Sequence, residues 1–349
     1  MNKKFIVGIE YDMRLIDYSL RNWPEKLNNN PEIEIKFLSK ERLSGPVRPE
    51  ELKDIDVFIF MGKRYVNEKS LQLATDLKWI GRFGAGFENI DISACNQKGI
   101  LVSNAPQGVS ESVAEFILSF MLALSTKLTI FDTLIRKNNS FEGSGKHMTS
   151  RLFQKILGII GFGSIGSRLS ELIKPFKMKL LINDPYVDKK TIMHVEAESV
   201  DLDYLLRHSD FISLNVPLTQ QTKGMLREED FKKMKRTAYL INTCRGGIYH
   251  DADLAKALEE GWLAGVATDV FENEPHVKEN LLLKVESHKT VLSPHIAGVS
   301  HNLDAINMTT DIITDSILKV KKGELPENIL NPNAVDINIP KNKLSPSFI

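Results

Sequence analysis

The stretch Ile156-Leu-Gly-Ile-Ile-Gly-Phe-Gly-Ser-Ile-Gly166 joins an apolar strand to a glycine-rich turn and the start of a helix. In such a turn the first glycine allows a tight bend, the second lets backbone N–H groups approach a pyrophosphate, and the third allows close helix–strand packing. Phosphate then binds at the helix N-terminus, where unpaired amides and the helix dipole favour negative charge. The pattern predicts a dinucleotide site formed by Gly161, Gly163, Ser164, Ile165 and Gly166.

A second predicted strand, 178–183, ends at Asp184, eighteen positions after Gly166. A carboxylate at this place can accept hydrogen bonds from both hydroxyls of an adenosine ribose, and it repels a 2′-phosphate. The expected cofactor is therefore NAD, although Lys189 and Lys190 follow closely enough to weaken the preference over NADP. An ordinary tight turn would leave Asp184 unexplained.

The composition is that of a globular protein large enough for two domains: 349 residues, 42% of them hydrophobic. Because 45 Lys and Arg balance 45 Asp and Glu, we expect no general attraction to nucleic acid or to an anionic membrane surface. No run approaches the roughly eighteen apolar residues of a transmembrane helix, so no membrane span is predicted. Cys95 and Cys244 lack metal-ligand spacing, which favours a reducing cytoplasm and no metal site.

Alternating strands and helices predict an α/β protein with two doubly wound parallel sheets. Expected strands of the first sheet are 5–9, 33–38, 57–61, 79–83 and 100–106, and those of the second are 156–161, 178–183, 211–215, 238–243, 266–270 and 290–293. A long apolar helix over 111–135 opens the second domain, and a helix over 301–322 returns the chain to the first. The predicted domains are 1–106 with 300–335, then 107–299, and a tail over 336–349.

Three polar segments follow predicted strands of the second sheet, at the edge where open α/β sheets bind ligands: 242–247, 269–275 and 293–298. A hydride enzyme acting on a 2-oxo acid needs a fixed cation that orients the carboxylate and polarises the carbonyl, and the planar fork of Arg245 can do both.

Such an enzyme also needs a proton donor that titrates near neutrality, and His295 fits that need. Glu274 would favour the imidazolium and fix the ring through its other nitrogen. Each residue taken alone is as readily a surface ion pair, a solvated charge or a packed histidine. Cys244, next to Arg245, is either a small packing residue or a thiol that the guanidinium activates.

These segments, in this order, resemble those of the D-isomer-specific 2-hydroxyacid dehydrogenases. The likeness runs from Trp79 to Asn331 through Gly84-Ala-Gly86, Val113-Ala-Glu115, Gly161 to Gly166, Asp184-Pro-Tyr186, Val216-Pro-Leu-Thr219, Asn242 to Gly246, Asp269 to Pro275 and Pro294 to Gly298. It implies a Rossmann NAD-binding domain, 107–299, inserted into a flavodoxin-like substrate-binding domain. It also implies a catalytic triad of Arg245, Glu274 and His295.

The resemblance assigns further residues to the substrate and to the cofactor. Gly84, Ala85 and Gly86 are implied to offer backbone amides to the substrate carboxylate, to which Arg245 also binds. Val113 would pack on the nicotinamide and Asp269 would bind its carboxamide, while the remaining cofactor contacts fall on Pro217, Thr222, Thr243, Arg245 and Gly298. A homodimer is implied too, in which the helix over 113–135 and the loop over 136–146 embrace a second subunit.

One departure from the family pattern concerns the substrate. Met61 stands where members with phosphorylated substrates often have arginine, although Lys63, Arg64 and Arg82 could form another anion site. A formate dehydrogenase would be expected to have glutamine in place of Glu274. A dinucleotide-sensing corepressor of the same fold remains an alternative to the enzyme. The sequence predicts a small 2-oxo or 2-hydroxy acid as substrate but specifies neither its side group nor the direction of the reaction.

Overall fold

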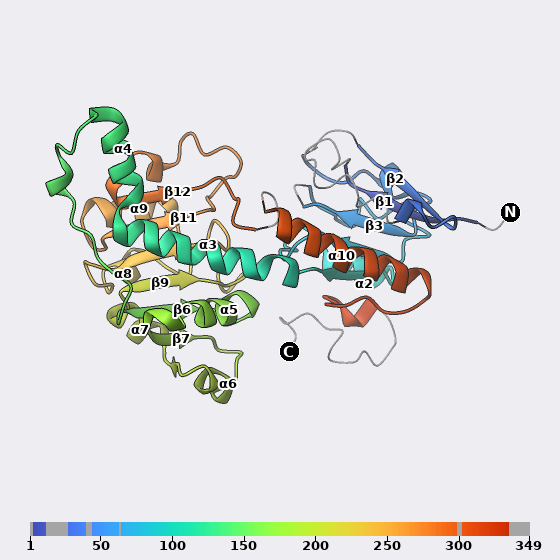
Figure 1. Ribbon diagram of the computed structural model, residues 1–349. Coiled ribbons are helices and arrows are strands. Elements are labelled where there is room, and N and C mark those ends of the chain that lie inside the picture. Colours follow the sequence, from blue (N-terminus) through green and yellow to red (C-terminus); the bar gives the residue numbers. More distant parts are fainter. Residues whose placement is uncertain (1–2, 12–26, 40–43, 63, 299–301, 335–349) are drawn as a thin grey trace. The chain divides into compact units, whose positions relative to one another are not determined.

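The computed structural model describes residues 3–11, 27–39, 44–62, 64–298 and 302–334 (Figure 1). The chain folds into two compact units, Met1–Val109 with His301–Ile349, and Ser110–Ser300. The sequence placed the two boundaries three residues and one residue earlier, after 106 and after 299. The predicted tail, 336–349, lies outside the described residues.

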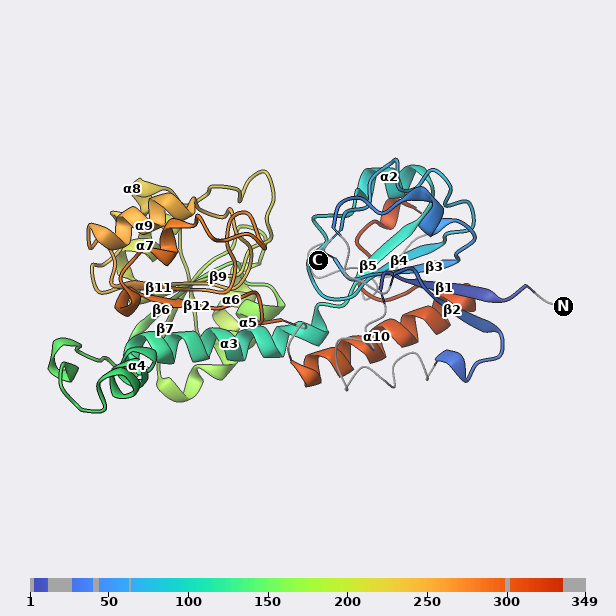
Figure 2. The same ribbon diagram turned by 90° about the horizontal axis from the view of Figure 1, so that it is seen from above.

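The first unit contains a five-stranded parallel sheet in the order β2-β1-β3-β4-β5. Most residues of β1, β3, β4 and β5 are buried, because helices cover both faces of the sheet, as is usual for a parallel sheet. Figure 2 shows α2 and α10 on opposite faces. The bounds are β1 Phe5–Ile9, β2 Ile33–Phe37, β3 Val57–Phe60, β4 Trp79–Arg82, β5 Leu101–Asn104, α2 Ile92–Gln97 and α10 Leu303–Lys321.

The last described segment of the chain lies along the edge strand β5. Leu330 N donates to Val102 O at 2.8 Å, and Val102 N donates to Asn331 Oδ1 at 2.7 Å. Asn331 Nδ2 in turn donates to Ile100 O at 2.9 Å. These bonds occupy the polar groups that an edge strand would otherwise expose.

The second unit contains a seven-stranded parallel sheet in the order β12-β11-β10-β9-β6-β7-β8. The order reverses between β6 and β9, and in sheets of this type ligands bind beyond the carboxyl ends of the strands at that point. The sequence did not predict β8, which has only two residues. The strands are β6 Ile156–Ile160, β7 Lys179–Asn183, β8 Glu198–Ser199, β9 Phe211–Leu214, β10 Tyr239–Asn242, β11 Gly265–Thr268 and β12 Thr290–Leu292.

Helices cover both faces of this sheet as well, with α7, α8 and α9 on one face and α3 and α5 on the other (Figure 2). Of the other two helices, α4 follows α3 along the chain and α6 joins β7 to β8. The bounds are α3 Gln107–Thr126, α4 Leu128–Asn138, α5 Ser164–Leu172, α6 Lys189–His194, α7 Leu202–His208, α8 Glu228–Phe231 and α9 Asp251–Glu259.

The single helix predicted over 111–135 is two helices. The break falls at Lys127, whose φ of 56° is left-handed and cannot continue an α-helix. By length and mean hydropathy alone α3 is apolar enough to cross a membrane, although polar residues interrupt its apolar run. More than half of the stretch, 56%, is buried inside the structure, as in the core helix of a globular domain.

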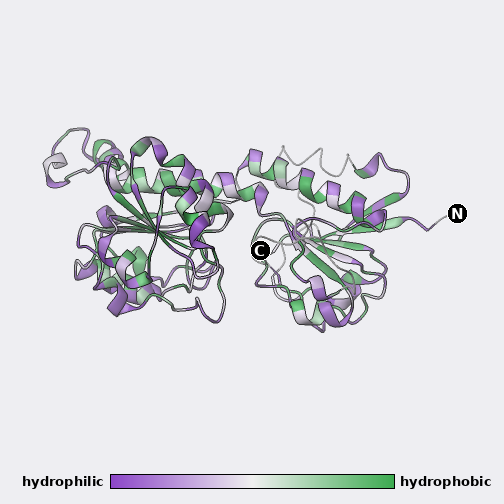
Figure 3. Cartoon of the chain, turned by 90° about the horizontal axis from the view of Figure 1, so that it is seen from below, coloured by the Kyte–Doolittle hydropathy of each residue, from purple (hydrophilic) through white to green (hydrophobic). Residues whose placement is uncertain are grey.

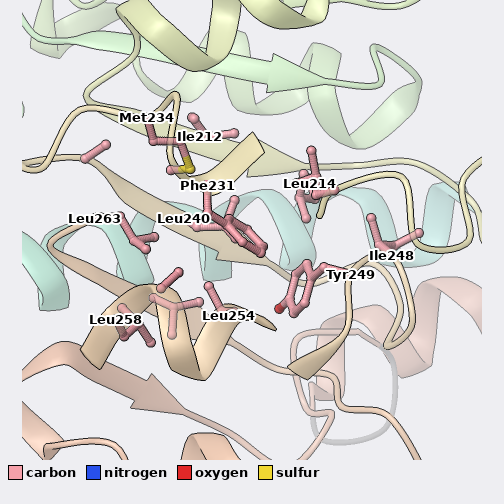
Figure 4. Close-up of a cluster of buried hydrophobic side chains, with 14 of the residues drawn as sticks. Ile212, Leu214, Phe231, Met234, Leu240, Ile248, Tyr249, Leu254, Leu258 and Leu263 are labelled. Carbon is pink, nitrogen blue, oxygen red and sulfur yellow. The ribbon is translucent and has the colours of Figure 1, made fainter. Parts of the chain in front are cut away.

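The core of the second unit fills the space between the sheet and the layer of α7, α8 and α9, and Figure 4 shows its side chains. Phe231 and Tyr249 meet edge to face with ring centres 6.1 Å apart. Hydrophobic residues follow the strands of each sheet and hydrophilic residues follow the outer helix surfaces (Figure 3). Tyr249 also reaches the ligand edge, because its hydroxyl accepts a hydrogen bond from Asn242 Nδ2 at 3.2 Å.

Candidate active site

The glycine-rich turn after β6 has the shape that a dinucleotide phosphate needs. Gly161 has a φ of 88°, and a Cβ there would lie 2.6 Å from Asn215 O. A Cβ on Gly166 would lie 2.6 Å from Gly161 O, so this glycine allows the helix to approach the turn. A Cβ on Gly163 would meet nothing within 4 Å, and no side chain caps α5. The open side of the turn therefore presents helix amides to an anion.

Asp184 contacts this turn directly. Its Oδ2 accepts a hydrogen bond from Phe162 N at 2.7 Å, and its Oδ1 accepts one from Tyr186 N at 2.8 Å. Each carboxylate oxygen keeps further acceptor capacity for a ribose hydroxyl. A cavity of about 590 Å³ lies at the carboxyl ends of β7 and β8, with Asp184, Lys189 and Tyr204 among its lining residues. These residues fit the adenosine half of NAD.

The loop after β9 is held by its own hydroxyl groups. Thr222 Oγ1 donates to Pro217 O at 2.5 Å and accepts from Thr219 N at 2.8 Å. Thr243 and Val113 are both buried, with 8% and 6% of their surface exposed. These two residues, Pro217 and Thr222 all lie in the second unit, and their contacts with NAD stay predictions.

His295 and Glu274 form a close pair, with Nδ1 and Oε2 2.7 Å apart. Glu274 is fixed on its other side because Oε1 accepts a hydrogen bond from Phe271 N at 2.9 Å. Burial raises the pKa of Glu274, but the hydrogen bond and charge of His295, the Phe271 amide and the charge of Arg245 together hold it below its ordinary value. An ionised carboxylate only accepts hydrogen bonds, so His295 Nδ1 carries a proton.

Arg245 lies on the turn after β10, which packs against the backbone that precedes Glu274. A Cβ on Gly246 would lie 2.0 Å from Phe271 O, so only glycine permits this approach. Asn242 Nδ2, at the end of β10, donates to Arg245 O at 3.0 Å and so fixes the turn. The structure thus brings the three predicted catalytic residues together at one edge of the second sheet.

Asp269 has a structural role that the sequence did not predict. Its side chain is fully buried, and its two oxygens accept hydrogen bonds from Ile296 N and Ala297 N at 2.8 Å each, and from Ser293 Oγ. Its backbone carbonyl accepts from His295 N at 2.9 Å. The residue thereby holds the histidine in its left-handed conformation, with a φ of 56°. Binding of the nicotinamide carboxamide by Asp269 stays a prediction.

Asp251, which the sequence analysis did not single out, anchors the segment that contains Glu274 to α9. Asp251 N donates to Glu272 Oε2 at 2.9 Å, and Glu272 N donates back to Asp251 Oδ2 at 3.0 Å. Asn280 Nδ2 donates to the same Oδ2. The only signal in the sequence was an aspartate at the start of a predicted helix, where acidic residues are common for other reasons.

Comparisons with known proteins give the family of the chain. Residues 118–297 match the family described as D-isomer specific 2-hydroxyacid dehydrogenase, NAD binding domain. A glyoxylate reductase of Korarchaeum cryptofilum is 34% identical over 298 residues, which are 83% of this chain and 87% of that protein. A D-3-phosphoglycerate dehydrogenase of Methanocaldococcus jannaschii is 36% identical over 308 residues, which are 88% of this chain and 56% of that protein. The chain belongs to the D-2-hydroxyacid dehydrogenase family.

Solved structures show the same architecture. The D-lactate dehydrogenase of Aquifex aeolicus, solved with NAD and lactic acid, is 27% identical, with a TM-score of 0.77 and coverage of 92% of this chain and 96% of that one. As a D-2-hydroxyacid dehydrogenase the chain is an NAD-dependent oxidoreductase, and the turn at 161–166 with Asp184 fits that cofactor. No group of three potential metal ligands occurs among the residues that the structure describes.

The basic residues considered for a phosphate in this dehydrogenase are engaged in structural contacts. Arg64 is 2% exposed and donates to both oxygens of Glu51, at 2.7 and 2.9 Å, and to Pro46 O at 2.7 Å. Arg82 donates to three backbone carbonyls. Lys63 lies outside the described residues. The suggestion that Arg64 and Arg82 form an alternative anion site was therefore wrong for Arg64 and has no support for Arg82.

Cys244 fits the packing interpretation. Burial raises the pKa of its thiol to about 11, although the nearby Arg245 lowers it, so the thiolate is scarce at neutral pH. Its Sγ lies 3.0 Å from Asn242 Oδ1. The raised pKa does not favour the alternative of a thiol activated by Arg245. The cytoplasmic location inferred from the few cysteines stays a prediction.

Proposed function

We propose that the protein reduces a small 2-oxo acid to the D-2-hydroxy acid, and catalyses the reverse reaction, with His295 as acid and base. The cofactor, when bound, would supply the hydride as NADH in reduction and receive it as NAD⁺ in oxidation. In reduction, His295 Nε2 gives a proton to the carbonyl oxygen, and in oxidation the neutral ring takes the proton back. Arg245 binds the carboxylate and polarises the carbonyl.

The observation that supports this proposal most directly is the 2.7 Å contact between His295 Nδ1 and Glu274 Oε2. A negative carboxylate at this distance stabilises the imidazolium that donates the proton, and it fixes the tautomer. A formate dehydrogenase needs no such proton donor, since oxidation of formate releases no proton from a hydroxyl group. The pair therefore favours a hydroxy acid over formate.

We further propose that the substrate is unphosphorylated and small, of the glyoxylate or pyruvate class. Several similar curated proteins, from Korarchaeum cryptofilum and Thermococcus litoralis among others, are named glyoxylate reductase. Met61 offers no charge to a phosphate, and Arg64 is buried against Glu51. From the family pattern we infer that Arg245 and the backbone amides of Gly84, Ala85 and Gly86 bind the carboxylate.

The experiment is a substrate screen with purified protein and NADH. Glyoxylate, pyruvate, hydroxypyruvate, oxaloacetate, 2-oxoisocaproate, phenylpyruvate and 3-phosphohydroxypyruvate are compared by kcat/KM. We expect glyoxylate, pyruvate or hydroxypyruvate to rank first and the phosphorylated acid last. NADH binding without turnover of any acid would instead support the dinucleotide-sensing corepressor, and a preference for the phosphorylated acid would refute the proposed substrate class.

We also propose a homodimer formed through α4 and the segment that follows it. Leu128, Ile135, Phe141 and Met148 expose 64%, 43%, 84% and 84% of their surface, which suits contact with a second copy. The sequence also predicted that α3 contacts the second subunit. Most of its apolar residues are already buried within the chain itself, so they support the dimer less: Val113, Ala114, Ile117, Phe120, Met121 and Leu124.

Light scattering should report twice the 39.4 kDa chain mass for the wild type, and a single chain for the double variant Leu128→Glu with Ile135→Glu. These exposed positions are better probes than buried Phe120 or Leu124, where a charge would destabilise the monomer itself. A monomeric wild type with full activity would refute the proposed dimer.

A further inference from the structure

The loop 84–86 begins with two carbonyl groups held by the end of β5. Gly84 O accepts a hydrogen bond from Ala105 N at 3.0 Å, and Ala85 O accepts one from the side-chain Nδ2 of Asn104 at 2.7 Å. A carbonyl oxygen only accepts, so the atom of Asn104 that faces it must be the amide nitrogen. Asn104 is 5% exposed, and its Oδ1 has no partner in the described part of the chain.

The third carbonyl of the loop is held by the end of β4. Gly86 O accepts a hydrogen bond from Arg82 Nε at 2.6 Å. The same guanidinium donates from Nη1 to Met61 O at 3.2 Å and to Phe83 O. One planar side chain therefore ties the loop to two further backbone segments, which a flexible ammonium group could not do in one geometry.

The position of Arg82 is itself fixed by a buried carboxylate. Glu10 Oε2 accepts hydrogen bonds from Met61 N at 2.6 Å and Gly62 N at 3.1 Å, and this residue is 3% exposed. Gly62 has a φ of 97°, and a Cβ there would lie 2.5 Å from Arg82 Nη2. The turn that Glu10 holds thus leaves just enough room for the guanidinium.

Because the peptide bonds are planar, these carbonyl contacts determine where the N–H groups of the following residues point. In a trans peptide the C=O of one residue and the N–H of the next point in opposite directions. The N–H groups of Ala85, Gly86 and Phe87 are therefore directed away from Ala105, Asn104 and Arg82 respectively. None of these three N–H groups donates a hydrogen bond to the residues described by the structure.

We propose that Asn104 and Arg82 are positioning residues for the substrate: by holding the carbonyls of Ala85 and Gly86, they orient the amides of Gly86 and Phe87 toward the carboxylate. Three outward amides on consecutive peptide units suit a carboxylate or another small oxyanion. Neither side chain touches the substrate. This inference rests on the proposed function, since it concerns the carboxylate of the same 2-oxo acid.

The test is the isosteric variant Asn104→Asp, which replaces the donating nitrogen with an oxygen that repels Ala85 O. We measure kcat and KM for the best 2-oxo acid, and the Kd of oxamate, an unreactive carboxylate analogue, in the presence of NADH. The variant should misalign the Gly86 amide and so weaken its hydrogen bond to the substrate carboxylate. Because that bond is made equally in the ground and transition states, KM and the oxamate Kd should rise about 10- to 100-fold, with kcat changed less than about threefold. The Kd of NADH should not change.

Asn331→Asp is the matched control. Asn331 is 2% exposed in the same unit and donates from Nδ2 to a backbone carbonyl, that of Ile100, at 2.9 Å. We expect this variant to change thermal stability without changing KM or the oxamate Kd. An unchanged KM in Asn104→Asp, or an equal rise in both variants, would overturn the inference.

Arg82→Lys is the second variant, for the case in which Asn104→Asp does not fold. It keeps the charge but loses the planar fork, so KM and the oxamate Kd should again rise while kcat and NADH affinity remain near wild type. Unchanged oxamate affinity here also contradicts the proposal. Failure of the proposed function looks different: the wild type itself would turn over no 2-oxo acid and bind no oxamate.

Discussion

The two units share one architecture and present different chemistry at the same place. Both have open parallel sheets covered by helices on two faces. At the carboxyl edge of the second sheet, side chains project from the strand ends, with Arg245, Glu274 and His295 in neighbouring turns. At the carboxyl edge of the first sheet the polar side chains Asn104 and Arg82 are turned onto the backbone.

Under the proposed function, this difference corresponds to two ways in which a sheet edge can serve a reaction. Side chains that move protons must reach the substrate, whereas backbone amides that bind a carboxylate need side chains only to hold them in place. Fold alone specifies neither role. The comparison predicts that substitutions at the second edge act mainly on kcat and that those at the first edge act mainly on KM.

The largest effect should come from His295→Ala. Removing the proton donor should lower kcat about 10²- to 10⁴-fold with little change in KM, since general acid–base catalysis is worth that much. His288→Ala is the control, because His288 also pairs with a glutamate, Glu286, at 3.1 Å in the same unit. Near-normal turnover in His295→Ala would move the proton donor elsewhere and break the comparison.

Glu274→Gln should have a smaller effect, about tenfold on kcat, and a distinct pH dependence. The pKa of Glu274 is held below its ordinary value, so the carboxylate is ionised throughout the neutral range and stabilises the imidazolium there. Without that charge, the loss of reductive activity as pH rises should begin at a lower pH. An identical pH profile in the two proteins would remove the role assigned to Glu274.

Cofactor preference tests Asp184, a residue at the edge of the second sheet that is proposed to bind the cofactor and to take no part in proton transfer. Wild type should prefer NADH, and Asp184→Ser should lower kcat/KM for NADH about tenfold while raising it for NADPH. Lys189 lines the same cavity, so Lys189→Ala should reduce whatever NADPH activity the wild type has. Equal kcat/KM for both cofactors in the wild type would show that Asp184 does not discriminate between them.

The smallest effect is expected at Cys244. Because burial raises the pKa of this thiol to about 11, peroxide should inactivate wild type and Cys244→Ser at the same rate. Turnover should be nearly unchanged, since serine keeps a donor for Asn242 Oδ1. Faster inactivation of the wild type, reversed by a thiol reductant, would restore the reactive-thiol hypothesis.

The sequence predicted the parallel sheets because their strands are short apolar runs between turn residues and helix-length segments. It missed β8, since two residues are too few to show a pattern. It also missed the break at Lys127, where apolar residues continue on both sides and only the left-handed backbone marks the end of α3. Hydrophobic pattern identifies elements well and their ends poorly.

The proposed catalytic residues Arg245, Glu274 and His295 could be selected from the sequence because each lies within a few residues of the end of a predicted strand. The positioning residues could not, because their partners depend on which strands are neighbours. Asp269 follows β11 and His295 follows β12, 26 positions later. Asp269 can hold the turn around His295 only because β11 and β12 are neighbours in the sheet. Asn104 reaches Ala85 because β4 pairs with β5. Neither pairing can be read from local sequence.

The bonds that tie 328–331 to β5 have a consequence for the order in which the protein is made. The second unit, Ser110–Ser300, is one continuous stretch, whereas the first needs residues from both sides of it. During synthesis from the N-terminus, the second unit can complete its sheet while β5 still lacks Leu330 and Asn331 as partners. The domain that begins first on the ribosome is therefore the one that finishes last.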